Sequence, residues 1–179
     1  MVSQLKVNEI IKQSGSSITI GENGDTVSGP FTMVPAFEAY LGSDQTITDT
    51  VTTKVQFNTE VYDTDNCYDN STNYRFTPTV AGKYFIYGSI KLQCETNDTV
   101  TDASIYLYKN GSPIRRLIAI FTSSNPITTC NPIINEIVDL NGSSDYVELF
   151  GNMNVSSGTP RFDAGDQSTF FGAYRITGA

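Results

Sequence analysis

Residues 83–92 read KYFIYGSIKL, a stretch that predicts a β-strand with apolar side chains on both of its faces. Successive side chains of a strand point to opposite sides, so the even-numbered positions form one apolar face. The odd-numbered face carries Phe85 and Tyr87 beside polar residues. A sandwich that stays monomeric would show polar residues on its solvent face. The stretch therefore predicts a strand whose second face is also covered by protein.

The same pattern recurs in the predicted strands 103–109 and 168–177. Tyrosine on an outer strand face is typical of subunit interfaces, because the ring buries area while its hydroxyl keeps a hydrogen-bond partner. The alternative is a larger sandwich in which a second sheet covers both faces within one chain. We predict a homo-oligomer with an aromatic interface, formed by Phe85, Tyr87, Tyr106, Tyr108, Phe171 and Tyr174.

From Pro35 onward the composition favours short strands and almost no helix, since charged residues are only 17% of the chain and β-branched, aromatic and turn residues are abundant. Asn110-Gly111 and Asn141-Gly142 predict hairpin-type turns in which positive φ is tolerated. Such regularly spaced strands indicate an antiparallel sandwich. The predicted strands are 36–41, 53–58, 74–77, 83–92, 103–109, 113–121, 133–140, 146–152 and 168–177.

The charge and the missing histidines exclude several classes of function. Lys and Arg total 11 against 19 Asp and Glu, a net charge of −8, which argues against nucleic acid or an anionic membrane as a partner. The chain has no His, which removes Ser-His-Asp and Cys-His catalysis and His-ligated metal sites. Cys67, Cys94 and Cys130 lack a CxxC spacing and are interpreted as buried free thiols.

Two groups of acidic residues are candidate sites of chemistry. The run 63–69 suggests calcium, but it lacks the glycine and glutamate of an EF-hand loop, and we interpret it as a solvated loop. A carboxylate pair could hydrolyse glycosides, yet acids at sandwich loops are usually solvating groups. We therefore predict no enzyme, no catalytic or metal-binding residue and no cofactor. The acids that could form such a pair are Asp145, Glu148, Asp163 and Asp166.

An ordered set of motifs resembles the globular head of complement C1q. It comprises residues 57–58 (FN), 68–69 (YD), 74–78 (YRFTP), 80–87 (VAGKYFIY), 105–113 (IYLYKNGSP) and 168–176 (STFFGAYRI). The resemblance spans residues 35–177 and implies the jelly-roll sandwich shared with tumour necrosis factor, assembled as a tight homotrimer. The chain departs from the animal pattern at residues 140–149, and it has no Gly-X-Y run and no secretory leader.

Residues 1–33 contain one aromatic residue, Phe31, and too little apolar surface to fold alone. They form either a disordered leader or one third of a symmetric β-rich stalk, and we favour the stalk, ahead of a head at residues 34–179. Residues 5–8 (LKVN) and 17–27 (SITIGENGDTV) resemble leaders of bacteriophage fibre and structural proteins that carry C1q-like heads. That resemblance implies docking to the virion through Leu5, Val7, Ile10, Ile18 and Ile20.

Together these features predict a trimeric bacteriophage virion protein, a short tail or capsid fibre or a decoration protein, whose head attaches to the host surface or to the particle. It would be made in the host cytoplasm without a signal peptide. Its expected partners are itself, other virion proteins and a host glycan or protein, without nucleic acid or membrane insertion. The alternative is a C1q-like secreted ligand or lectin that binds glycans or protein receptors. Exposed loops at 122–131 and 154–162 could then carry recognition.

Overall fold

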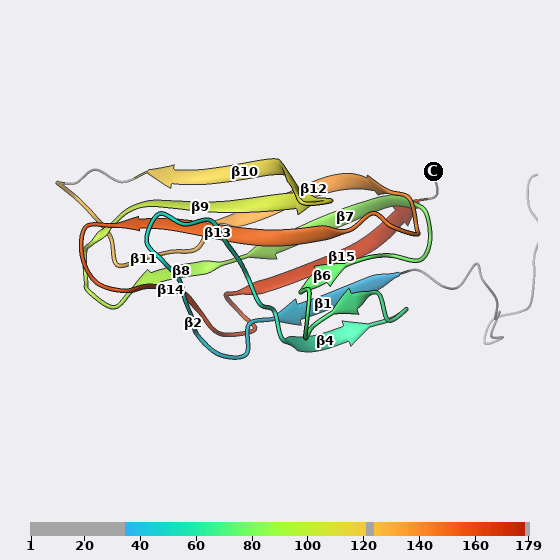
Figure 1. The fold of residues 1–179 in the computed structure, drawn as a ribbon, viewed down its shortest axis with the longest axis horizontal. Helices are drawn as coiled ribbons and strands as arrows, with labels where there is room; N and C mark the ends of the chain where they lie inside the picture. The colour runs from blue at the N-terminus through green and yellow to red at the C-terminus, as the bar shows by residue number, and fades with distance from the viewer. Residues whose placement is uncertain (1–34, 121–123, 178–179) are drawn as a thin grey trace, which may run out of the picture. The chain divides into compact units, whose positions relative to one another are not determined.

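The structure, a computed structural model, describes residues 35–120 and 124–177, which form strands and loops without a helix (Figure 1). The all-β prediction is confirmed. No helix in this described part could cross a membrane. The strands are β1 (Ala36–Tyr40), β2 (Gln45–Thr46), β3 (Thr53–Lys54), β4 (Thr59–Asp63), β5 (Tyr68–Asp69), β6 (Arg75–Phe76), β7 (Gly82–Ser89), β8 (Lys91–Cys94), β9 (Val100–Lys109), β10 (Ser112–Ile120), β11 (Thr129–Cys130), β12 (Ile133–Leu140), β13 (Val147–Val155), β14 (Pro160–Asp163) and β15 (Phe170–Thr177).

The strands pair in antiparallel fashion into three sheets. A five-stranded sheet has the order β12-β7-β15-β1-β4, and a six-stranded sheet has the order β10-β9-β13-β6-β5 with β3 joined to β13. A four-stranded sheet, β11-β8-β14-β2, extends the sandwich at one end, as the run from β7 into β8 shows in Figure 1. The larger two sheets face each other, since a side chain at Gly88 of β7 would overlap Leu149 of β13.

The core is built around Phe37 of β1, which is fully buried. Its ring stacks on Tyr68 and Phe76 at centroid distances of 4.4 and 4.7 Å, and it meets Phe171 edge-on at 5.0 Å. These rings come from β1, β5, β6 and β15, so one aromatic cluster joins the five-stranded and six-stranded sheets. The Tyr68 hydroxyl donates a hydrogen bond to the Phe57 carbonyl at 3.0 Å, which satisfies the polar end of a buried ring.

The two predicted Asn-Gly turns have different outcomes. Asn110 and Gly111 adopt φ values of 52° and 77°, as a two-residue hairpin between β9 and β10 requires. At the second site Gly142 has a φ of 69°, but β12 and β13 lie in different sheets, so the hairpin prediction there is wrong. The Asn141 side chain accepts backbone N–H groups up to Asp145 and so shapes a loop that crosses between sheets.

The predicted strand 83–92 is interrupted at Ile90, where the chain passes from the five-stranded to the four-stranded sheet. The Lys91 N–H donates to the hydroxyl of buried Thr169 at 3.0 Å instead of to a neighbouring strand. The sequence did not indicate this break, because apolar alternation continues through it. The short strands β2, β4, β5, β11 and β14 were also missed, since they are only two to five residues long and largely polar.

The predicted boundary near residue 33 lies outside the described residues, and so do the residues expected to anchor the protein to the virion. The head itself is described from Pro35 onward. The residues of the predicted anchor are Leu5, Val7, Ile10, Ile18 and Ile20.

Candidate functional site

The outward face of the five-stranded sheet carries a continuous group of rings, which we call the aromatic face: Phe85 and Tyr87 of β7 with Phe170 and Tyr174 of β15. Phe85 lies 5.5 Å from Tyr174 and 6.0 Å from Tyr87, and Tyr87 lies 6.3 Å from Phe170, centroid to centroid. Tyr174 is 43% exposed. Contact with water over so many rings is unfavourable, so this face favours burial against another surface.

Tyr87 is held in place by polar contacts at its tip. Its hydroxyl donates to the Glu38 carboxylate of β1 at 2.8 Å and lies 3.4 Å from the hydroxyl of Tyr62 in β4. Burial, together with hydrogen bonds to Tyr62 and Glu38, raises the pKa of Tyr87 well above its usual range. The phenol therefore stays protonated and keeps donating. Because these hydrogen bonds fix the position of the Tyr87 ring, this part of the aromatic face has a defined shape before a partner binds.

The aromatic face continues onto β12, an end strand of the sheet, where Ile137 stands beside Phe85 in register. Ile137 and Ile133 are 55% and 59% exposed. Next to β12 lies β10, the end strand of the six-stranded sheet, and an ion pair between Arg115 and Glu136 links the two. The exposed apolar residues of β10 are Ile114, Leu117 and Ile118, which we call the apolar edge. Leu117 and Ile118 are consecutive, so they point to opposite sides of this end strand.

The structure brings together only part of the predicted interface. Phe85, Tyr87 and Tyr174 share the aromatic face, whereas Phe171 is fully buried in the core. Tyr106 and Tyr108 lie on the outward face of the six-stranded sheet, where Tyr108 meets the Phe150 ring at 4.2 Å. Alternation assigns residues to opposite strand faces but does not say which face meets the second sheet. Consequently Phe171 and the two β9 tyrosines do not belong to this surface.

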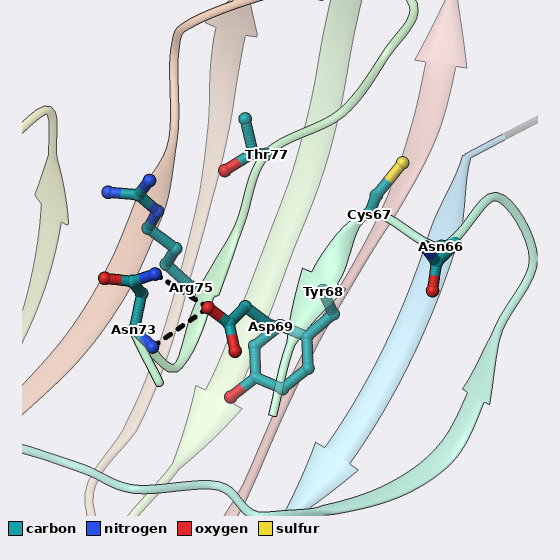
Figure 2. Close-up of a pocket in the computed structure, with 7 residues that line it drawn as sticks. All are labelled: Asn66, Cys67, Tyr68, Asp69, Asn73, Arg75 and Thr77. Carbon is teal, nitrogen blue, oxygen red and sulfur yellow. Dashed lines mark hydrogen bonds between the residues drawn. The ribbon is translucent and has the colours of Figure 1, made fainter. Parts of the chain in front are cut away.

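A polar pocket of about 350 Å³ lies beside the β5–β6 hairpin (Figure 2). Residues 66–69 of the pocket belong to the acidic run that the sequence suggested as a calcium site and that we interpreted as a solvated loop. The sequence did not indicate a site at Asn73, Arg75 or Thr77. Arg75 stands at one wall, with its guanidinium 4.4 Å from the centroid of the Tyr146 ring. The residues that line the pocket are Asn66, Cys67, Tyr68, Asp69, Asn73, Arg75 and Thr77.

Asp69 organises the pocket loop. It accepts the backbone N–H groups of Ser71, Thr72 and Asn73 at 3.1, 2.9 and 3.0 Å, and the Asn73 side chain donates to it as well (Figure 2). These hydrogen bonds, led by that from Thr72, hold the pKa of Asp69 well below its usual range. Burial raises the pKa of the nearby Cys67 thiol to about 11, so it stays protonated and unreactive at neutral pH.

The other acids of the run 63–69 are also occupied by the fold. Asp63 accepts the Tyr68 N–H at 2.7 Å, and Asp65 accepts the Thr79 hydroxyl. Across residues 35–120 and 124–177, no group of three or more His, Cys, Asp or Glu is placed to hold a metal ion. These carboxylates therefore act as caps that shape the loop between β4 and β6.

Three of the four acids considered for glycoside hydrolysis form ion pairs. Asp145 pairs with Lys109 at 3.0 Å, Glu148 with Lys54, and Asp163 with both Lys91 and Arg161. Asp166 is exposed in the loop before β15. Pairing to a cation favours the charged form of a carboxylate, whereas a general acid needs its proton retained. The Asn110 and Lys109 contacts accordingly lower the pKa of Asp145.

Comparison with known proteins identifies the fold. No protein-family model matches the sequence, and no curated protein matches it. The structure is similar to that of the Eiger TNF from S. frugiperda, with a TM-score of 0.57 at 11% identity over 82% of this chain and 94% of that one. It is also similar to murine APRIL at pH 5.0, with a TM-score of 0.58 at 11% identity over 80% of this chain and all of that one. The described part of the chain is therefore a jelly-roll sandwich of the TNF-like fold, as the sequence motifs predicted.

Proposed function

We propose that this protein is a homotrimeric structural protein of a bacteriophage virion, a short tail or capsid fibre or a decoration protein. Its head would attach to the host surface or to the particle. The observation that carries the self-association is the aromatic face, on which Phe85, Tyr87 and Tyr174 form one contiguous outward surface. Monomeric proteins rarely leave large apolar patches uncovered, and aromatic residues are enriched where subunits meet.

The two apolar surfaces support a closed ring better than a simple pair. The aromatic face lies on β7 and β15 and continues onto β12, whereas the apolar edge lies on β10, the end strand of the other large sheet. A contact between the edge of one copy and the face of the next joins two different surfaces, and such heterologous contacts close into cyclic oligomers. The exposed end strand β10 is also covered in this way, which removes an open sheet edge. A trimer is the ring that the C1q and TNF resemblance implies.

The virion role is supported by the leader. Residues 5–8 and 17–27 resemble leaders of phage fibre and structural proteins. The proposed contacts of the leader with other virion proteins are Leu5, Val7, Ile10, Ile18 and Ile20. Synthesis in the host cytoplasm followed by particle assembly needs no signal peptide. The neighbours' names support the alternative, a secreted ligand, since one is called a TNF. That alternative predicts protein free in the medium rather than in particles.

The first experiment is the native mass of the full-length chain in solution. We expect about three times 19.6 kDa, and a monomer at micromolar concentration would contradict the ring. Mass spectrometry of purified virions then tests location, with a chain lacking residues 1–33 as the variant. The truncated chain should still form trimers but be absent from particles. Normal incorporation of the truncated chain would refute the docking role of the leader.

A further inference from the structure

We infer that the pocket beside the β5–β6 hairpin binds a carboxylate-bearing sugar, with the Arg75 guanidinium as the group that holds the carboxylate. The inference rests on the proposed role in attachment, because it names the class of surface molecule that the head would contact. Its evidence is independent of the aromatic face, which lies on the opposite sheet of the sandwich.

Arg75 lacks the partner that most cations of the head have. Within residues 35–120 and 124–177, no carboxylate lies within ion-pair distance of its guanidinium and no side chain bonds to it. This contrasts with the chain's net charge of −8. The residues that do form ion pairs are Lys54, Lys83, Lys91, Lys109, Arg115 and Arg161. An arginine left unpaired in an acidic protein is available to a ligand.

The Tyr146 ring orients the Arg75 guanidinium. The Arg75 Cζ atom lies over the Tyr146 ring, 4.4 Å from its centroid, and no described carboxylate lies within ion-pair distance of the guanidinium. The guanidinium is a planar fork of donors whose spacing matches the two oxygens of a carboxylate. Because the fork is held against a ring, less side-chain entropy is lost when a ligand binds. Tyr74, beside it in the chain, has a φ of 50°, a costly conformation for a bulky residue that turns the backbone at this point.

The acid that shares the pocket does not compete for Arg75. Five donors converge on the Asp69 carboxylate: the N–H groups of Ser71, Thr72 and Asn73, the Ser71 hydroxyl and the Asn73 amide. A carboxylate offers about four lone-pair sites, so Asp69 has no acceptor capacity left for a ligand. The binding capacity that remains belongs to Arg75 and to the side chains of Thr77 and Asn66, which form no hydrogen bond with another described residue. The pocket thus offers hydrogen-bond donors and favours a ligand with many hydrogen-bond acceptors.

The size and surroundings of the pocket suit a sugar. A volume of about 350 Å³ is at the small end of the range for ligand pockets and suffices for a single sugar ring. Lys54 donates to the Asn73 carbonyl at 3.1 Å, which connects the pocket loop to the outward face of the six-stranded sheet. There the Tyr108 and Phe150 rings, 4.2 Å apart and tilted by 33°, offer an apolar contact to the next ring of an oligosaccharide.

The test titrates the full-length protein with glucuronate, galacturonate and N-acetylneuraminate, each beside its methyl ester, by calorimetry or NMR. We expect at least one free acid to bind and its ester, which lacks the charge, to bind at least about tenfold more weakly. Arg75→Gln should remove the preference for the acid. Arg116→Gln is the matched control, because Arg116 also stacks on a tyrosine, Tyr106, and also lacks a carboxylate partner, yet lies outside the pocket.

Four results would overturn the inference: no binding of any of the three acids, equal binding of acid and ester, an equal loss in Arg116→Gln, or binding of inorganic phosphate as strong as that of the sugars. The last would indicate a general oxyanion site. The Arg75→Gln variant must keep the native mass of the wild type for its loss to count. A failure here leaves the trimer and the virion location untouched, since those are measured by mass and by particle composition.

Discussion

The ring of Tyr87 lies across the backbone of Gly172 on the neighbouring strand, and a side chain at Gly172 would overlap it, with a Cβ only 2.8 Å from the Tyr87 Cε2 atom. Gly172 pairs in register with Tyr87 on one side and with Glu38 on the other. Because Gly172 has no side chain, the Tyr87 ring can lie across β15, and its hydroxyl can reach the Glu38 carboxylate two strands away. A glycine inside a strand has a cost in entropy, which this close approach explains.

Replacing Gly172 with Ala is expected to lower the free energy of unfolding by about 1–3 kcal/mol, because the Tyr87 ring must move and its bond to Glu38 breaks. Chemical denaturation measures the change. Tyr87→Phe is the control, since it keeps the ring and loses only the hydroxyl, at a cost of about 1 kcal/mol. A Gly172→Ala protein as stable as the wild type would show that the ring is not held over the strand.

Tyr174→Glu and Tyr106→Glu form a matched pair, because the two tyrosines lie on the outward faces of opposite sheets. A charge buried without a partner in an interface is strongly unfavourable, whereas on an exposed face it is tolerated. We expect Tyr174→Glu to reduce the native mass to that of one 19.6 kDa chain and Tyr106→Glu to leave the oligomer intact. The reverse result would move the interface to the six-stranded sheet.

Phe171→Ala should destabilise each subunit by about 3–5 kcal/mol, since the ring is fully buried and contacts Phe37 and Phe57. The measurement is urea unfolding in the monomeric Tyr174→Glu background, where assembly does not contribute. There the loss should be independent of protein concentration. If the variant unfolds like its parent and only changes oligomerisation in the wild-type background, then Phe171 acts in an interface, as alternation alone had suggested.

The stability of the head should fall in acid partly through Asp69. Its folded pKa lies below its unfolded value, because backbone N–H groups stabilise the charged form. Its contribution is therefore complete above the ordinary Asp pKa of about 4 and is lost as the pH falls below it. Asp69→Asn should show a smaller drop in melting temperature between about pH 5 and pH 3 than the wild type. An identical drop in both proteins would assign the acid sensitivity to other carboxylates, such as Asp145 and Asp163.

Several features were readable from the sequence because they depend on neighbouring residues alone. Alternation with a period of two identified long strands such as β7 and β12 and showed that Phe85 and Tyr87 share a face. The Asn110-Gly111 turn followed from the preference of those residues for positive φ. The motif order from residue 57 to residue 176 indicated the TNF-like jelly roll, which the solved neighbours support.

Only the tertiary structure decided which face of each strand is buried and which strands are neighbours. Phe171 belongs to the core, and Tyr106 lies on the outward face of the six-stranded sheet rather than beside Tyr174 on the five-stranded sheet. All three residues come from strands with the same alternating pattern. Likewise the pocket gathers Asn66, Asp69 and Arg75 around the β5–β6 hairpin. The sequence indicated a strand at 74–77 but not its pairing with β5 or the pocket beside it. The physical reason is that alternation is a local property of the backbone, whereas sheet membership is set by contacts between residues far apart in the chain.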